Sequence, residues 1–132
     1  IKAVKDINQT TDIISTLRKY NIKFALDDFG SGISSFSYLK NLPVDYLKID
    51  GDIIKNISRN TTDKAMVAAI NQIGKVMNIK IIANHVENIF TLNQLKNIGI
   101  DYAQGFYLGE PKQINECFEK SKESIPKHSV KP

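Results

Sequence analysis

Short apolar runs alternate with longer amphipathic stretches along this 132-residue chain, and the alternation is the feature that most constrains its fold. The apolar runs are typical of parallel strands that are covered on both faces, and we expect strands at residues 22–26, 45–50, 79–83 and 102–108. The amphipathic stretches have the periodicity of helices, and we expect helices at residues 4–20, 34–40, 62–77, 89–97 and 112–122. This order predicts an α/β protein, either part of a doubly wound sheet or part of a (β/α)8 barrel.

Two of the predicted helices carry signals at their ends. Thr61 or Thr62 is expected to cap the helix that starts at residue 62, and Gly99 is expected to end the helix over 89–97. The tail has two prolines and no periodicity after Ser124. We therefore expect one domain at residues 1–122 and a flexible tail at 123–132.

The composition is that of an ordinary globular domain, with 42% hydrophobic residues and a net charge of +4. Lysines and acidic residues are interspersed without an arginine-rich stripe, which argues against a nucleic acid polymer as partner. No apolar stretch is long enough to span a membrane. Cys117 is the only cysteine, which excludes an internal disulfide and fits a reducing cytoplasm. Because the chain starts with Ile1 rather than Met, we expect it to begin inside a longer protein.

Polar residues stand where each predicted strand ends. They are Asp27 and Asp28, Lys48 and Asp50, Asn84, and Gln104. The carboxyl ends of parallel strands meet at one edge of a sheet, where α/β proteins bind their ligands. Polar residues can also simply mark where strands stop, but four strand ends in succession favour a ligand site.

Two of these positions indicate specific chemistry. Adjacent carboxylates such as Asp27 and Asp28 repel each other unless a hard cation such as Mg²⁺ or Mn²⁺ stabilises them, although either residue could instead cap a turn. Lys48 points opposite to its apolar neighbours, which in a barrel places its ammonium in the lumen or at the mouth. There it could hold a phosphate oxygen or orient an attacking water. On an edge strand the same lysine would face solvent.

Four segments resemble, in the same order and at the same spacings, the motifs of EAL domains, the cyclic di-GMP phosphodiesterases and their degenerate relatives. Residues 25–32 (ALDDFGSG) are similar to the DDFGTG segment, and residues 34–50 are similar to its continuation, ending here in VDYLKID. Residues 82–88 (IANHVEN) resemble the strand end IAEGVET, and residues 99–111 (GIDYAQGFYLGEP) resemble the terminal GxDxxQGYxxxKP. The chain thus resembles the C-terminal half of the domain.

The resemblance implies about four strand–helix units of a (β/α)8 TIM-like barrel, with substrate lying across the carboxyl ends of the strands. It implies metal-dependent hydrolysis of cyclic di-GMP to linear pGpG, with Asp27 and Asp28 as ligands of Mg²⁺ or Mn²⁺. Lys48, Glu87 and Gln104 match catalytic positions, and Lys48 and Gln104 match positions that also touch the substrate. The loop at residues 29–35 matches the segment that links metal binding to dimerisation in the family.

The chain departs from the family pattern in ways that bear on activity. The EAL motif, the metal-binding Asn and the Glu of the ITE strand would all precede Ile1. Asn84 stands where the family has a Glu, and an amide cannot accept a proton near neutral pH. His85 follows where Gly or Phe is usual, and we expect it to fill a variable position.

Three functions remain open at this point. The chain could be half of a catalytic phosphodiesterase that is inactive by itself, a degenerate domain that binds cyclic di-GMP or a protein without hydrolysis, or a scaffold for protein contacts. Four units of a barrel leave sheet edges uncovered, so we expect a homodimer or the remaining half of the barrel as partner. GGDEF or sensor domains are further expected neighbours in a bacterial parent chain, which could be anchored to a membrane.

Overall fold

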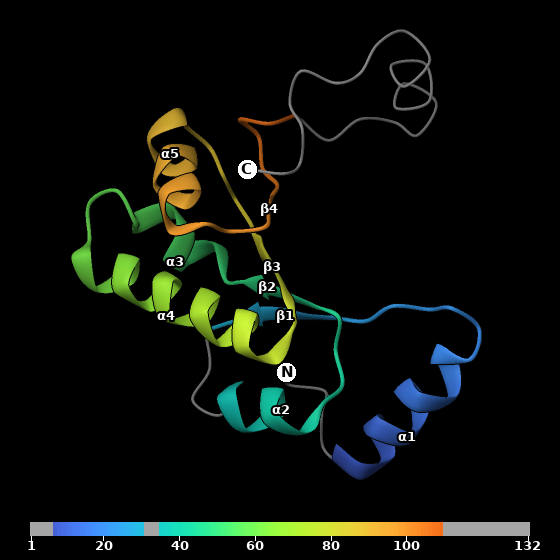
Figure 1. The fold of residues 1–132 in the computed structure, drawn as a ribbon. Helices are drawn as coiled ribbons and strands as arrows, with labels where there is room; N and C mark the ends of the chain where they lie inside the picture. The colour runs from blue at the N-terminus through green and yellow to red at the C-terminus, as the bar shows by residue number, and fades with distance from the viewer. Residues whose placement is uncertain (1–6, 31–34, 110–132) are drawn as a thin grey trace, which may run out of the picture.

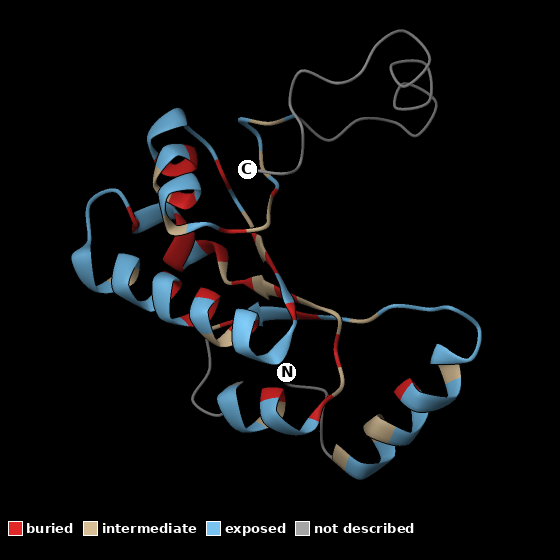
Figure 2. Cartoon of the chain, in the orientation of Figure 1, coloured by how far each residue is buried: buried red, intermediate tan, exposed pale blue. Residues whose placement is uncertain are grey.

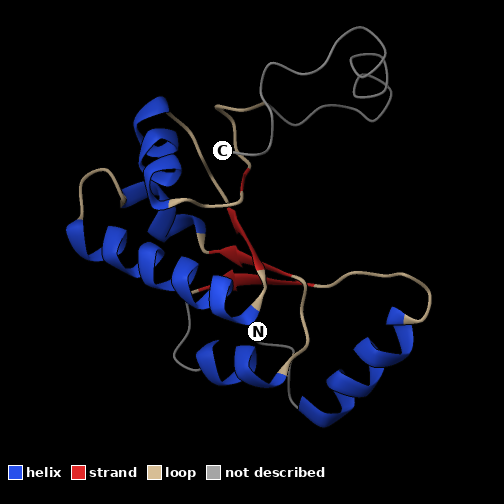
Figure 3. Ribbon diagram, in the orientation of Figure 1, coloured by secondary structure: helices blue, strands red, loops and turns tan. Residues whose placement is uncertain are grey.

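A computed structural model describes residues 7–30 and 35–109, and it shows an α/β arrangement (Figures 1 and 3). The helices are α1 (Ile7–Arg18), α2 (Ser35–Asn41), α3 (Gly51–Asn56), α4 (Thr61–Met77) and α5 (Ile89–Ile98). The strands are β1 (Ala25–Phe29), β2 (Tyr46–Ile49), β3 (Lys80–Ala83) and β4 (Tyr102–Ala103). The predicted helix at 112–122 and the predicted tail lie outside the described residues.

The four strands form one parallel sheet in the order β1-β2-β3-β4. Each strand therefore pairs with the next one along the chain, and helical segments connect them. A doubly wound sheet reverses its strand order at a switch point, whereas a (β/α)8 barrel adds strands in one direction only. The observed order contains no such reversal and is the order expected of a barrel segment.

The sheet is packed on one face only. In β2, Leu47 and Ile49 are fully buried while Tyr46 and Lys48 remain partly exposed, and β3 alternates in the same way (Figure 2). Helix α4 approaches the buried face closely, because a Cβ atom on Gly74 would lie 2.5 Å from Ile81. The expectation that both faces are covered is therefore wrong for the described residues, and the second face is open.

Fully buried aliphatic and aromatic side chains form the core between the sheet and the helices. Each contributes about 1.5–3 kcal/mol through removal of apolar surface from water. The largest of them are Phe29, Leu39, Leu47, Ile49, Ile54, Ile57, Ile81 and Leu95. These side chains come from α2, α3, α5 and three strands. The core they form therefore holds the carboxyl edge of the sheet in place relative to the loops that follow the strands.

Helix α4 begins at an asparagine cap, one residue before the threonines that the sequence suggested. The Oδ1 of Asn60 accepts hydrogen bonds from the backbone N–H groups of Thr62 and Asp63, at 2.9 and 3.2 Å. Asparagine is a strong N-cap because its side-chain oxygen satisfies amides that the first turn leaves unpaired. The prediction for α5 is confirmed, since Gly99 ends that helix with a φ of 91°.

Two strands differ from their predicted bounds by more than one residue at an end, and α3 was not predicted. The first strand lies at Ala25–Phe29 instead of 22–26, and the last is only Tyr102–Ala103 instead of 102–108. The last strand stops early because the chain turns back toward the segment after β3. There the Val86 N–H donates to the Gln104 carbonyl at 3.0 Å, and a Cβ on Gly105 would lie 2.3 Å from the Val86 nitrogen.

Candidate ligand site at the carboxyl edge of the sheet

Asp27 and Asp28 lie inside β1, at a bulge, and not after the strand as the sequence suggested. Leu26 pairs with Leu47 and Phe29 pairs with Ile49, so two aspartates of β1 stand opposite a single residue of β2. Asp28 adopts the left-handed conformation, with a φ of 52°. A bulge of this kind leaves the extra residue outside the ladder and redirects side chains. Both carboxylates are consequently exposed between two buried residues.

Asn84 follows β3, and its side chain reaches across β2 to the bulge of β1. Its Nδ2 donates to the Oδ1 of Asp27 at 3.5 Å, at the long end of the hydrogen-bond range. The Asn84 Oδ1 is buried and has no hydrogen-bond partner in the described part of the chain. The structure thus brings together the first carboxylate of the bulge and the amide at the family's Glu position.

Lys48 is the residue of β2 that stands opposite the two aspartates. It pairs with Ile82 of β3 and lies on the partly exposed face of the sheet. Strand β2 is flanked by β1 and β3, so the alternative of a lysine on an edge strand is wrong. An ammonium on the open face of the sheet is suited to hold a phosphate oxygen.

Glu87 and Gln104 lie apart from this group. The Glu87 Oε1 is 4.0 Å from the Nζ of Lys55, and both side chains are nearly half exposed. Gln104 is exposed, and its backbone N–H donates to the Ala83 carbonyl at 2.9 Å, which pairs the end of β4 with β3. Among the described residues no hydrogen bond or ion pair joins either side chain to Asp27, so their catalytic roles stay predictions.

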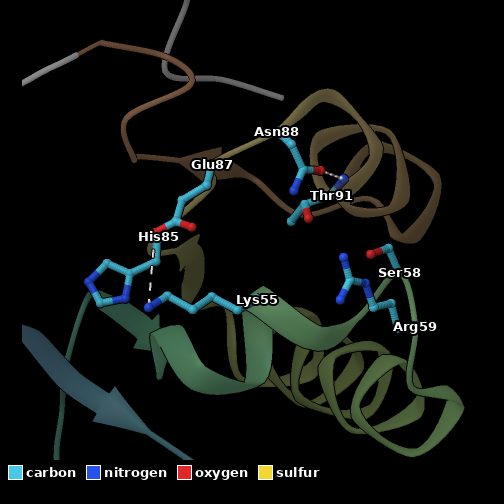
Figure 4. A pocket seen from close by; sticks show the side chains of 7 residues that line it. All are labelled: Lys55, Ser58, Arg59, His85, Glu87, Asn88 and Thr91. Atoms are coloured by element: carbon cyan, nitrogen blue, oxygen red, sulfur yellow. Dashed lines mark hydrogen bonds and ion pairs between the residues drawn. The ribbon is translucent and has the colours of Figure 1, made fainter.

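Glu87 instead lines a cleft of about 190 Å³ between α3 and the segment from β3 to α5 (Figure 4). We call it the Arg59 cleft, and its lining residues are Lys55, Ser58, Arg59, His85, Glu87, Asn88 and Thr91. Sequence reasoning missed Lys55, Arg59 and Asn88. The available signal was weak, because two cations four residues apart are common on any solvated helix face.

His85 is held against the start of α3. Its φ is 58°, and a Cβ on Gly51 would lie 1.8 Å from its Nδ1, so the imidazole rests directly on the glycine backbone. Helix α3 follows β2 at once, with the Asp50 side chain accepting a hydrogen bond from the Asp52 N–H at 3.0 Å. The residue at position 85 thus packs against the helix that carries Lys55.

The aspartates of the bulge fit part of a divalent metal site. Asp27 and Asp28 supply carboxylate oxygens, the ligands that Mg²⁺ and Mn²⁺ prefer. In residues 7–30 and 35–109, however, no group of three or more His, Cys, Asp or Glu side chains could hold a metal ion. Two carboxylates from one strand do not complete an octahedral shell, so these residues alone do not fit the metal centre of the family.

No helix in the described ranges is long and apolar enough to cross a membrane.

A barrel-type sheet with carboxylates, a lysine and an amide at its carboxyl edge defines an α/β domain with a candidate ligand site, and comparisons with known proteins assign its family. The family model described as EAL domain matches residues 2–111. Because this match covers most of the chain, the chain belongs to the EAL domain family. The resemblance found in the sequence motifs is thereby confirmed.

The curated relatives are much longer than this chain. "Cyclic di-GMP phosphodiesterase PdeB" of Shewanella oneidensis is 44% identical over 118 residues, which cover 89% of this chain and 14% of that protein. "Cyclic di-GMP phosphodiesterase PdeA" of Borreliella burgdorferi is 47% identical over 98 residues, covering 74% of this chain and 15% of that protein. Both similarities identify the domain, whereas the activities in these names belong to the relatives.

Solved structures agree with the fold. The crystal structure of the EAL domain of Mycobacterium smegmatis DcpA superimposes with a TM-score of 0.86 at 33% identity, over 93% of this chain and 56% of that chain. The PaMucR phosphodiesterase, solved as a c-di-GMP complex, has a TM-score of 0.79 at 36% identity, over 87% of this chain and 47% of that one. The chain thus spans about half of each, which confirms the expected partial TIM-like barrel.

Proposed function

We propose that this chain serves cyclic di-GMP signalling by binding the dinucleotide at the carboxyl edge of its sheet, and that by itself it does not hydrolyse it. Family membership supports the ligand, since the solved relatives include complexes with c-di-GMP. The proposal that the chain does not hydrolyse the dinucleotide by itself is supported by the contact between Asn84 and Asp27. An amide donor occupies the place where hydrolysis would need a carboxylate.

In this proposal the residues of the open face hold the ligand. Lys48 would contact a phosphate oxygen, because it lies on the open face beside the strand ends where α/β folds place substrates. Gln104, exposed at the end of β4, would touch the same ligand through its amide. Asp27 and Asp28 would supply only two ligands of a Mg²⁺ or Mn²⁺ centre, so the remaining ligands would have to come from outside the described residues.

Hydrolysis would require groups that the described residues do not supply. An attacking water must lose a proton, and the Asn84 side chain cannot accept one near neutral pH. The donor set around Asp27 is also too small for the metal centre, as described above. The remaining half of the barrel, or a second copy on the open face, would have to complete the site. A domain that binds without hydrolysis is the alternative that Asn84 itself favours.

Turnover and binding must be measured separately. The full chain should be incubated with cyclic di-GMP and Mg²⁺ or Mn²⁺ while the formation of pGpG is followed by chromatography, and binding should be titrated by calorimetry. We expect heat of binding without metal-dependent pGpG. Clear pGpG formation would show that the chain is catalytic by itself. No heat at high ligand concentration would instead support a role in protein contacts only.

A further inference from the structure

The two walls of the Arg59 cleft come from two separate segments of the chain. One wall is α3 with the turn that follows it, and the other is the segment between β3 and the start of α5 (Figure 4). Its volume of about 190 Å³ far exceeds the roughly 30 Å³ that one water molecule occupies in the liquid. The cleft is therefore large enough to admit a small ligand.

The charges in the cleft do not cancel. Lys55 and Glu87 lie 4.0 Å apart and offset each other. Arg59 has no acidic partner within the described ranges, and its guanidinium points into the space between α3 and α5 (Figure 4). A guanidinium presents several N–H donors in a planar fork that matches the oxygens of phosphate groups. The cleft consequently has one excess positive charge, carried by Arg59.

Asn88 adds a neutral donor whose orientation is fixed by the fold. Its Oδ1 accepts the Thr91 N–H at 2.8 Å as the N-cap of α5. Because the oxygen end of the amide is used in the cap, the nitrogen end is left to donate, and Figure 4 shows it turned toward the cleft. Ser58 offers a hydroxyl on the opposite wall. Neutral donors thus lie on both walls of the cleft, beside the excess charge.

We propose that the Arg59 cleft binds a phosphate group, with Arg59 as its charged anchor and Asn88 and Ser58 as neutral donors. A tetrahedral anion can accept from donors on two walls at once, which suits the placement of these side chains. The proposal does not rest on cyclic di-GMP as ligand, because Asp27, Lys48 and Asn84 are not among the residues that line the cleft. Free phosphate and the phosphate of a nucleotide are two sources of the same chemistry.

The test is a titration of the ¹⁵N-labelled full chain with inorganic phosphate, 5′-GMP and guanosine, followed by NMR. Two variants remove the site in different ways: Arg59→Gln removes the charge, and Asn88→Asp keeps the cap oxygen but replaces the donor by a carboxylate. Lys23→Gln is the control for the first, because Lys23 is exposed in the loop before β1. Asn93→Asp is the control for the second, since Asn93 is exposed on α5 and does not line the cleft.

We expect phosphate and 5′-GMP to shift the amide signals of Asn88 and Thr91 saturably, and guanosine to leave them unchanged. Arg59→Gln should weaken phosphate binding about tenfold, as expected for the loss of a hydrogen-bonded charge. Asn88→Asp should abolish it at an unchanged melting temperature, and both controls should bind as the wild type does. Equal affinity in all five proteins, no saturable shift, or binding of guanosine as tight as that of 5′-GMP would overturn the proposal. Loss of cyclic di-GMP binding alone would not affect it.

Discussion

The side-chain amide of Asn84 reaches over β2 to the carboxylate of Asp27, with 3.5 Å between Nδ2 and Oδ1. The contact joins the bulge inside β1 to the residue that follows β3, and these two strands are not neighbours in the sheet. It also affects the electrostatics of the site. The Asn84 amide donates a hydrogen bond to the Asp27 carboxylate, whereas a Glu at position 84 would repel that carboxylate.

Asn84→Glu tests this relationship directly. Without metal, a carboxylate next to Asp27 should lower the stability by roughly 1 kcal/mol through like-charge repulsion. With added Mg²⁺ or Mn²⁺ the variant should gain thermal stability, because a third carboxylate improves the ligand set and metal binds only the folded state. Differential scanning fluorimetry across a metal titration measures both effects. Asn84→Gln is the control, and an equal metal response of the two variants would contradict the explanation.

Lys48→Met should reduce the affinity for cyclic di-GMP by about tenfold, because it removes a charge-assisted contact to phosphate. The methionine retains most of the apolar stem, so the folded structure should persist. Calorimetric titration measures the affinity. Lys64→Met serves as control, since Lys64 is an exposed lysine on helix α4 and not on a strand of the sheet. Unchanged affinity in Lys48→Met would remove this lysine from the proposed site.

Gly51→Ala should destabilise the fold by about 1–3 kcal/mol, because the added methyl would overlap the imidazole of His85. The double variant Gly51→Ala/His85→Gly should recover most of this loss, since it removes the ring and relieves the left-handed backbone at position 85. Urea denaturation gives the free energies of unfolding. Gly109→Ala is the matched control, as nothing lies within 4 Å of the place that its added methyl would occupy. Additive losses in the double variant would show that the two residues do not interact.

Asn60→Ala should cost about 1 kcal/mol of stability, because the first turn of α4 loses its acceptor for two backbone N–H groups. Asn60→Asp should retain the stability, since its carboxylate can accept the same bonds. Thermal unfolding followed by circular dichroism measures the difference. An equal loss in Asn97→Ala, at an exposed position of α5, would indicate that the effect comes from the helix in general and not from the cap.

Sequence patterns predicted the class of fold, the number of strands and most helices, because apolar periodicity reports directly which residues are buried. They missed α3, because a helix of only six residues is too short to show a clear apolar periodicity. The early end of β4 could not be predicted, since it depends on contact between Gly105 and Val86, which are distant in the chain.

Part of the candidate site was also predicted from the sequence, because apolar runs indicate where the strands end. Asp27, Lys48 and Asn84 were identified as strand-end residues, and the structure places them at the same edge of the sheet. The bulge was missed, because the left-handed conformation of Asp28 arises in the pairing of β1 with β2. The Arg59 cleft was missed because its walls come from segments whose approach depends on tertiary packing.

The bulge in β1 makes the length of this strand as important as its composition. Regular pairing between Leu26 and Phe29 would leave room for one residue opposite Lys48, and the structure accommodates two. A deletion of either aspartate would restore a continuous ladder and leave a single carboxylate on the open face. Homologous chains that lose one residue here should therefore differ in metal chemistry even if every remaining side chain is identical.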